Sequence, residues 1–329
     1  MRFRKVNELS RSVATSAIGA LLIAHGVIVV AAYPDRPIRI VVPVAPGGGN
    51  DIVARMLAQK LSETWGQSVV VDNRPGAATA IGAEIVARAI PDGYTIMLTS
   101  VSFAINAGVR RKLPFDPIRD FAPITHVARV PQIMLVNPTL PATSLAEFIA
   151  LAKARPAQIN YASAGTGSST HLAMELFADM AGIRLNHVPY KGTAPGLTDV
   201  IAGHVQTSFD AIPPALPHVR SARVRALAIG GSRRFPTLPD VPTFAEGGMP
   251  NYTFSSWFGI FAPARTPEDI VRKLNQELVR IIKLPETSRT FTELGIEPLG
   301  TSPEAFGDYV RSEIARWTDV VRKHNLRGE

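Results

Sequence analysis

The sequence predicts an α/β protein built from two lobes. Strand-like and helix-like segments alternate along the chain, the alternation starts again near residue 131, and each half has a small-residue loop between a strand and a helix. With 329 residues and 46% hydrophobic content, the chain can bury a substantial core, and this length favours two domains. Only 7% of the residues are aromatic, and 27 prolines and 25 glycines separate many short elements, which disfavours a helical bundle.

The first 32 residues differ in composition from the rest. Four basic residues lie among the first eleven, and the range 13–32 then contains no Lys, Arg, Asp or Glu and ends in Val-Ala-Ala. This pattern predicts a secretory signal peptide over 1–32, cleaved near Ala32. An uncleaved membrane anchor is the alternative, because the apolar stretch is long enough to span a bilayer.

Composition excludes several classes of function. Residues 1–32 hold four of the 35 basic residues and one of the 27 acidic residues, so the remaining chain has a net charge of +5. Its basic residues are scattered, whereas nucleic-acid binding needs a basic stripe with aromatics among it. A mild positive charge suits small anionic ligands better. The chain contains no cysteine, which excludes thiol catalysis and cysteine-bound metals.

The elements of the first half follow a β-α-β-α-β order, which predicts a parallel sheet with right-handed crossovers. Apolar residues at i, i+4 spacing mark the first helix, and a Pro-Asp-Gly turn ends the second. The predicted segments are strands at 38–44, 68–71 and 94–99, a helix from an Asn50 or Asp51 N-cap to Trp65, and a helix at 81–90.

The second half repeats the pattern before the chain returns to the first lobe. Its predicted strands are 133–136, 159–165, 184–190, 205–211 and 224–230, and its helices are 144–153, 170–180 and 195–203. After an irregular proline-rich run at 233–250, we expect a strand at 253–261, a helix capped by Thr266 with Pro267 at its first position, and a last helix at 303–324. This order predicts a first lobe of 33–130 and 253–329, a second lobe of 131–252, and hinges near 125–135 and 253–261.

A glycine-rich loop, "VVPVAPGGGNDIVAR", joins the first strand to the first helix. Its spacing matches neither the G-x-G-x-x-G dinucleotide fingerprint nor a P-loop, which needs a lysine. Free backbone N–H groups at a helix start favour an anion, although a tight turn would also need glycine. The candidate residues are Pro46, Gly47, Gly48, Gly49, Asn50 and Asp51.

A second strand-to-helix loop, "ASAGTGSSTHLAMEL", offers hydroxyls and glycine amides. Two such loops facing one another can hold one carboxylate without a cationic side chain, because hydrogen bonds to charged groups are strong. Ligands of open α/β sheets bind beyond the carboxyl ends of the strands, where both loops belong. The candidates here are Ala164, Gly165, Thr166, Gly167, Ser168, Ser169 and His171.

Catalysis and metal binding are weaker interpretations of the second loop. "GTGSST" is not a G-x-S-x-G nucleophile elbow, but an esterase using Ser168 or Ser169 remains the alternative function. His171 and Glu175 have the spacing of two metal ligands, and no third ligand is evident. We therefore predict no catalytic residue, metal or cofactor.

Further polar residues follow predicted strands and should border the same cleft. Ser100 and Ser102 follow one strand, and Tyr190 and Lys191 follow another. Lys191 either meets a second carboxylate or is a solvated loop residue. Asp210 ends the "TSFDA" strand, where it either meets a ligand hydroxyl or amine or caps the following segment.

Many ordered segments of residues 33–323 resemble the Bug proteins, the TctC-like substrate-binding proteins of tripartite tricarboxylate transporters. They include "YPDRPIRIVVPVAPGGGNDIVAR", "VVVDNRPGAATAIGAEIVARAIPDGYT", "LPFDPIRDFAPIT", "INYASAGTGSSTHLAMELF", "HVPYKGTAPGLTDVIAGHV" and "SWFGIFAP". Asn50 departs from the Thr, Ala or Ser more usual in the family, and "SVSFAIN" departs from the Ser-Asn or Ser-Gly sequence more usual after that strand. Both departures concern the distal ligand contacts.

The resemblance implies a periplasmic binding protein of the type II-like Venus flytrap class, with two lobes that close on a ligand. It implies that 46–51 and 164–171 grip a carboxylate, partly through ordered waters. The family's ligands include amino acids, dicarboxylates, tricarboxylates and aromatic acids. The implied partners are the membrane components of a transporter, or a sensor protein, and we expect a monomer that binds no nucleic acid.

Overall fold

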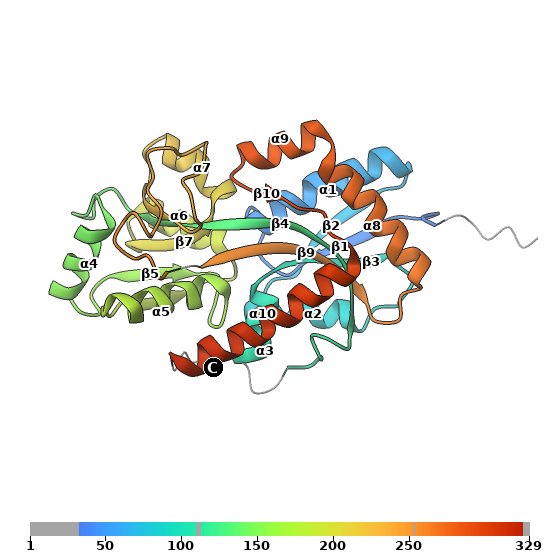
Figure 1. The fold of residues 1–329 in the computed structure, drawn as a ribbon, viewed down its shortest axis with the longest axis horizontal. Coiled ribbons are helices and arrows are strands. Elements are labelled where there is room, and N and C mark those ends of the chain that lie inside the picture. The colour runs from blue at the N-terminus through green and yellow to red at the C-terminus, as the bar shows by residue number, and fades with distance from the viewer. Residues whose placement is uncertain (1–32, 110–112, 253, 325–329) are drawn as a thin grey trace, which may run out of the picture. The chain divides into compact units, whose positions relative to one another are not determined.

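The described part of the chain forms a mixed sheet of ten strands flanked by helices (Figure 1). The computed structural model describes residues 33–109, 113–252 and 254–324, so the predicted signal peptide lies outside the described residues. The strands are β1 (Ile38–Val42), β2 (Val69–Asn73), β3 (Thr95–Ser100), β4 (Phe121–Val136), β5 (Asn160–Ser163), β6 (Asn186–Pro189), β7 (Thr207–Ala211), β8 (Arg225–Ile229), β9 (Ser255–Pro263) and β10 (Glu297–Pro298). The helices are α1 (Gly49–Trp65), the 3-10 helix η1 (Ala77–Thr79), α2 (Ala80–Ala87), α3 (Ser102–Val109), α4 (Leu145–Ala154), α5 (Ser169–Ala181), α6 (Thr193–Ala202), α7 (Ile212–Arg220), α8 (Glu268–Lys283), α9 (Pro285–Glu293) and α10 (Pro303–Lys323).

Each half of the sheet contains three parallel strands joined by helical crossovers. In the first half β1 lies between β2 and β3, and in the second half β5 lies between β6 and β7. The crossovers place the starts of α1, α5 and α7 directly after β1, β5 and β7. The carboxyl ends of these strands therefore deliver helix N-termini to the same edge of each half.

Two long antiparallel strands connect the halves. β9 pairs with β3 and with β4 as far as Pro131, and the last residues of β4, from Gln132 to Val136, pair with β7 and β8. β4 is thus a single strand shared by both halves, and Figure 1 shows it running beside β9 through the middle of the fold. The fold is two-lobed as predicted, while the lobe boundaries and the hinges near 125–135 and 253–261 remain predictions.

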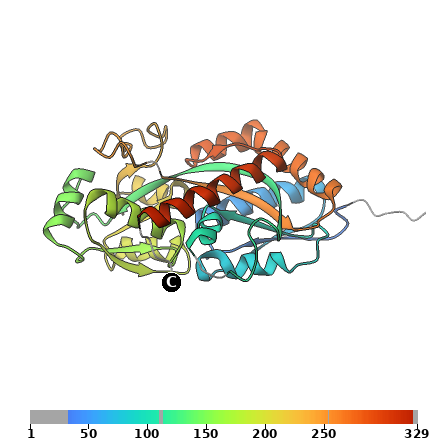
Figure 2. The same ribbon diagram turned by 60° about the horizontal axis from the view of Figure 1, so that its bottom comes forward.

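Alternation along the strands divides the core between the two faces of the sheet. Ile38 and Ile40 of β1 join the apolar cluster under α1 and α8, whereas Val41 belongs to the cluster under α2, α3 and α10. Figure 2 shows α10 lying across the face of the shared strands. On this helix Phe306 packs so closely on β9 that a Cβ at Gly259 would lie only 2.1 Å from its ring.

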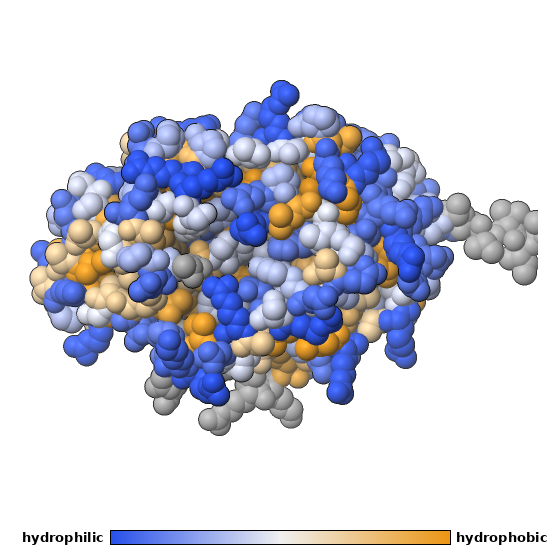
Figure 3. Space-filling view, in the orientation of Figure 1, coloured by the Kyte–Doolittle hydropathy of each residue, from blue (hydrophilic) through white to orange (hydrophobic). Residues whose placement is uncertain are grey.

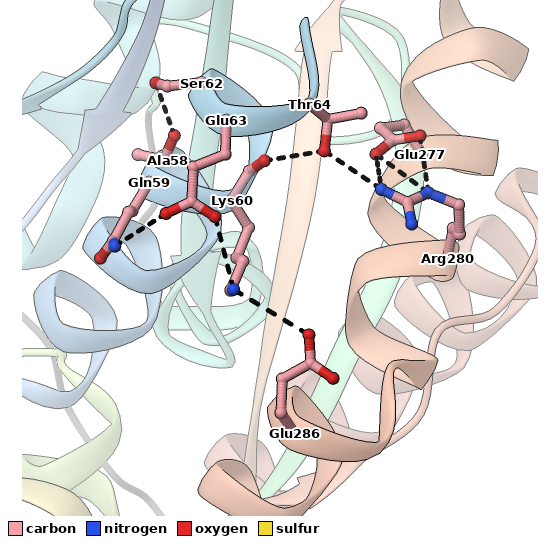
Figure 4. Close-up of polar contacts among 9 residues, drawn as sticks. All are labelled: Ala58, Gln59, Lys60, Ser62, Glu63, Thr64, Glu277, Arg280 and Glu286. Carbon is pink, nitrogen blue, oxygen red and sulfur yellow. Dashed lines mark hydrogen bonds and ion pairs between the residues drawn. The ribbon is translucent and has the colours of Figure 1, made fainter.

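Polar contacts fix the outer side of α1 to α8 and α9 (Figure 4). Lys60 of α1 lies 4.0 Å from the Glu286 carboxylate, and Arg280, paired with Glu277, donates to the Thr64 hydroxyl at 3.1 Å. Exposed ion pairs of this kind contribute at most about 1 kcal/mol each. The position of α1 therefore depends mainly on its buried apolar side.

Helix starts are where the predicted elements needed correction. α1 begins at Gly49 with Gly48 as N-cap, not at Asn50 or Asp51, and α8 has Pro267 as N-cap, not Thr266. Ser144 caps α4 as predicted by accepting the Glu147 N–H. The helices α3 and α7 were not predicted, because α3 has only eight residues and the sequence of α7 contains three prolines.

Hydrophilic side chains cover most of the face drawn in Figure 3, with apolar residues scattered among them. Within the described ranges, no helix combines the length and the apolar character that crossing a membrane requires.

Candidate ligand-binding site

The first candidate loop ends β1 and opens α1 without a side-chain cap. Gly48 is the N-cap, and no side chain there accepts a hydrogen bond from the first turn of the helix. Gly47 has a φ of 85°, a conformation that favours glycine. The N–H groups of the first turn are therefore oriented toward the edge of the sheet, where they favour an anion.

Asp51 holds this loop in shape. Its Oδ2 accepts the Gly47 N–H at 2.9 Å and the Arg55 Nε–H at 3.0 Å, and its Oδ1 accepts from the Asn73 amide at 3.0 Å. Burial alone would raise the pKa of Asp51, but these bonds, Arg55 first, lower the pKa below its ordinary value. With both carboxylate oxygens bound within the protein, Asp51 is placed to position the loop.

The second candidate loop, between β5 and α5, is organised by its own side chains. The Ala164 N–H donates to the Thr170 hydroxyl, the Gly165 N–H to the Ser163 hydroxyl, and the Gly167 N–H to His171 Nδ1, at 2.9, 3.1 and 3.1 Å. Ser168 is the N-cap of α5 and accepts the His171 N–H. The loop is therefore already ordered before a ligand contributes anything.

Two stacked imidazoles, those of His171 and His187, contact the second loop. The rings of His171 and His187 stack with centroids 4.1 Å apart, and His187 Nε2 lies 2.6 Å from the Ser163 hydroxyl. Burial lowers the pKa of each imidazole to about 4. Neutral His171 can accept the Gly167 N–H at Nδ1, which protonated His171 could not.

Contacts between the two halves bring together residues in and beside the two loops. The Ala45 N–H donates to the Lys191 carbonyl at 3.2 Å, and the Ser169 N–H donates to the Ser102 hydroxyl at 2.9 Å. A Cβ at Gly49 would lie 3.0 Å from both the Ala211 side chain and the Phe258 ring. Residues that were predicted separately in the two halves are thus neighbours. We call the place where Ala45 and Gly49 meet Lys191, Ala211 and Phe258 the junction.

Asp210 lies beside this junction. It is 1% exposed at the end of β7, its Oδ1 accepts the Ala211 N–H at 2.7 Å, and its Oδ2 has no hydrogen-bond partner among the described residues. Burial raises the pKa of Asp210 to about 7, against the opposing effects of the Ala211 N–H and the Thr193 hydroxyl. The N-cap of α7 is Ala211, so the predicted capping by Asp210 is wrong in position by one residue.

The remaining candidates differ in how they meet the junction. Asn50 is buried and its Nδ2 has no partner among the described residues, and Ser100 is buried where β3 pairs with β9. The Tyr190 hydroxyl instead donates to Asp199 at 2.5 Å, and Lys191 is exposed. Pro46 is exposed at the tip of the first loop, and Thr166 is half-buried in the second.

The geometry gives no support to the esterase alternative. The Ser168 hydroxyl accepts from the backbone N–H of His171, while the His171 ring is bound to Gly167 and stacked on His187, so Ser168 lacks an imidazole base. Ser163 does pair with His187, but it is buried and also accepts the Gly165 N–H. Among the described residues, no group of three or more acidic or histidine side chains is arranged to hold a metal ion.

Several contributors were missed from the sequence. Arg55, Asn73, Thr193 and His187 shape the loops from other elements. A partial signal existed for His187, because the parallel register of β5 and β6 places it opposite Tyr161, two residues before Ser163. The contacts of Thr193 depend on how α6 meets the first loop, which no local pattern encodes.

A shallow groove lies outside the junction, between Gly47 and the outer sides of α6 and α7. It has a volume of about 440 Å³, and His218 and Arg223 supply its basic groups. The groove is a second place where an anion could bind, with a cationic side chain instead of backbone N–H groups.

Comparison with known proteins places this geometry in context. A Rhodopseudomonas palustris protein solved with adipate is 38% identical, covers 90% of this chain and 99% of its own, and superposes with a TM-score of 0.87. The periplasmic binding protein BugD is 34% identical, with coverages of 90% and 100% and a TM-score of 0.87. MatC from R. palustris, solved with malate, is 33% identical, with coverages of 88% and 100% and a TM-score of 0.84.

The family of tripartite tricarboxylate transporter receptors matches residues 53–326, which is most of the chain. The fold of this chain, with two parallel-stranded halves joined by β4 and β9, superposes on the folds of the similar periplasmic binding proteins over nearly their whole length. The chain therefore belongs to the tripartite tricarboxylate transporter receptor family, the TctC-like Bug proteins.

Proposed function

We propose that this receptor captures a small carboxylate in the periplasm, between the loops at 46–51 and 164–171, and delivers it to the membrane components of a tripartite transporter. The observation that carries the proposal is the pairing of an uncapped helix start at Gly48–Gly49 with a second, pre-ordered helix start at Ser168–Ser169. The N–H groups of the first turn of α1, together with the N–H groups and hydroxyls of the second loop that are not bound within the protein, stabilise a carboxylate without a cationic side chain.

The ligands of similar proteins support a carboxylate over other anions. Adipate and malate occupy two of the similar structures, and both are small dicarboxylates. The lack of an imidazole base at Ser168 supports binding without turnover. We propose a receptor that acts as a monomer and performs no catalysis.

A thermal-shift panel tests the proposal. The panel contains mono-, di- and tricarboxylates, amino acids and aromatic acids, with the neutral amide of each hit as its matched control. A ligand that binds only the folded protein stabilises it by about 2.7 kcal/mol at a hundredfold excess over Kd. We expect at least one carboxylate, and not its amide, to raise the melting temperature. A shift produced only by neutral sugars or by cations would contradict the proposal.

A further inference from the structure

The Asp210 carboxyl group is buried with half of its hydrogen-bonding capacity unused. Its Oδ1 accepts the Ala211 N–H at 2.7 Å, and its Oδ2 is buried with no hydrogen-bond partner among the described residues. Opposite Asp210 on β4 lies Ile133, which packs in the cluster under α6 and α7, so Asp210 faces these two helices. An ionised carboxylate in this position would lose its hydration without gaining a cationic partner.

Part of the cover over Asp210 comes from the other half of the fold. Ala211, whose N–H donates to Asp210, and Thr193, whose hydroxyl lowers the pKa of Asp210, each meet the first loop. A Cβ at Gly48 would lie 3.4 Å from the Thr193 hydroxyl, and a Cβ at Gly49 would lie 3.0 Å from the Ala211 side chain. Moving the first loop away from α6 and α7 would therefore admit water to the carboxyl group.

Charged and titratable groups on the surrounding elements are engaged elsewhere or exposed. On the side that Asp210 faces, Asp51 is bound to Arg55 and Asn73, Asp199 to Tyr190 and His204, and His218 to Arg223, while Lys191 and Arg220 are exposed. On the opposite side, His171 and His187 stack on each other, Glu175 accepts from Tyr161, and Asp179 contacts His324. On β4, Arg129 pairs with Glu297 and His126 stacks on Tyr309.

We propose that Asp210 is a positioning residue that takes up one proton from solvent when the first loop closes over it, so that ligand capture is coupled to protonation. This inference rests on the proposed function, because the bound carboxylate drives the closure. A second negative charge on the ligand, held at the adjoining helix starts, also favours the neutral form of Asp210.

The sign of the coupling follows from the two states of the carboxyl group. With the first loop against Thr193 and Ala211, as in this structure, burial raises the pKa of Asp210 to about 7, whereas a solvated Asp has a pKa near 3.8. Between these values closure binds a proton, so affinity weakens as pH rises, by up to about tenfold per pH unit. Above about pH 7 the dependence disappears, because Asp210 is ionised in both states. Burial of His171 and His187 would give the opposite slope.

Calorimetric titration with the best carboxylate from the thermal-shift panel tests the coupling. Titrations at pH 5, 6, 7 and 8, each in two buffers of different ionisation enthalpy, give both the affinity and the number of protons taken up. We expect uptake approaching one proton at pH 6 in the wild type and none from this site in Asp210→Asn, which mimics the neutral acid and should bind well across the range. Asp240→Asn, at an exposed site, is the matched control and should keep the wild-type slope.

The outcomes separate this inference from the proposed function. Carboxylate binding without proton uptake in the wild type would overturn the coupling and leave the proposed function intact, even if Asp210→Asn failed to fold. A second contradicting result would be affinity that rises with pH in the wild type together with loss of binding in Asp210→Asn. That result would show that ionised Asp210 contacts a donor on the ligand, and it would also overturn the proposed coupling. A wild type that binds no carboxylate at any of these pH values would overturn both proposals.

Discussion

At the residue scale, single polar side chains connect the two halves next to the proposed ligand. Ser102 is the clearest example, because its hydroxyl accepts the buried N–H of Ser169, the first residue of α5. Asp51 acts similarly within one half by holding Gly47. Each of these side chains supplies an acceptor for an N–H group that the fold would otherwise leave without one.

Replacing Ser102 by alanine should leave the Ser169 N–H buried and unsatisfied. We expect the free energy of unfolding in urea to fall by about 1–3 kcal/mol, the cost of an orphaned buried donor. Ser312→Ala is the matched control, because that exposed hydroxyl donates to the Tyr309 carbonyl within α10 and should change stability by at most about 0.5 kcal/mol. Equal effects of the two substitutions would contradict the role assigned to Ser102.

The residues of the site were only partly predictable from the sequence, because some of them act through contacts between distant parts of the chain. The glycines and serines of the two loops are local signals, since strand, loop and helix follow one another in the sequence. The bond between Ser102 and Ser169 joins residues 67 positions apart and depends on α3, a helix that the sequence did not predict. Nor did the local pattern show that Tyr190 would turn toward Asp199.

At the element scale, the start of α1 matters because it approaches the other half so closely. Gly49 is the first residue of the helix, and its lack of a side chain lets the helix start lie against Ala211 and Phe258. The glycine run therefore serves close approach at Gly49 and a positive φ at Gly47.

Gly49→Ala should weaken ligand binding while leaving α1 helical. The added methyl group would lie 3.0 Å from Ala211 and Phe258, and overpacking of this kind costs about 1–3 kcal/mol, equivalent to roughly 5- to 150-fold in affinity. Gly307→Ala is the matched control in α10, because its Cβ would meet Pro123 at an ordinary 3.4 Å. Calorimetric titration of both variants measures the effect. Undiminished affinity in Gly49→Ala would show that capture does not need this close approach.

At the scale of the whole molecule, β4 and β9 make the two halves one continuous sheet. The order of most strands and helices was predictable, because apolar runs and turn residues mark these elements locally. The extent of β4 was not, since only 133–136 showed a clear strand pattern and the structure extends the strand back to Phe121. Its first part is defined by pairing with β9, more than a hundred residues away in the sequence.

The central claim is that one carboxylate is held by helix starts from both halves. A crystal structure with the best carboxylate from the thermal-shift panel tests this claim most directly. The account predicts that the carboxylate oxygens accept hydrogen bonds from N–H or hydroxyl groups of both loops, at 46–51 and 164–171. A carboxylate bound by one loop alone, or seated in the outer groove against Arg223, would contradict it.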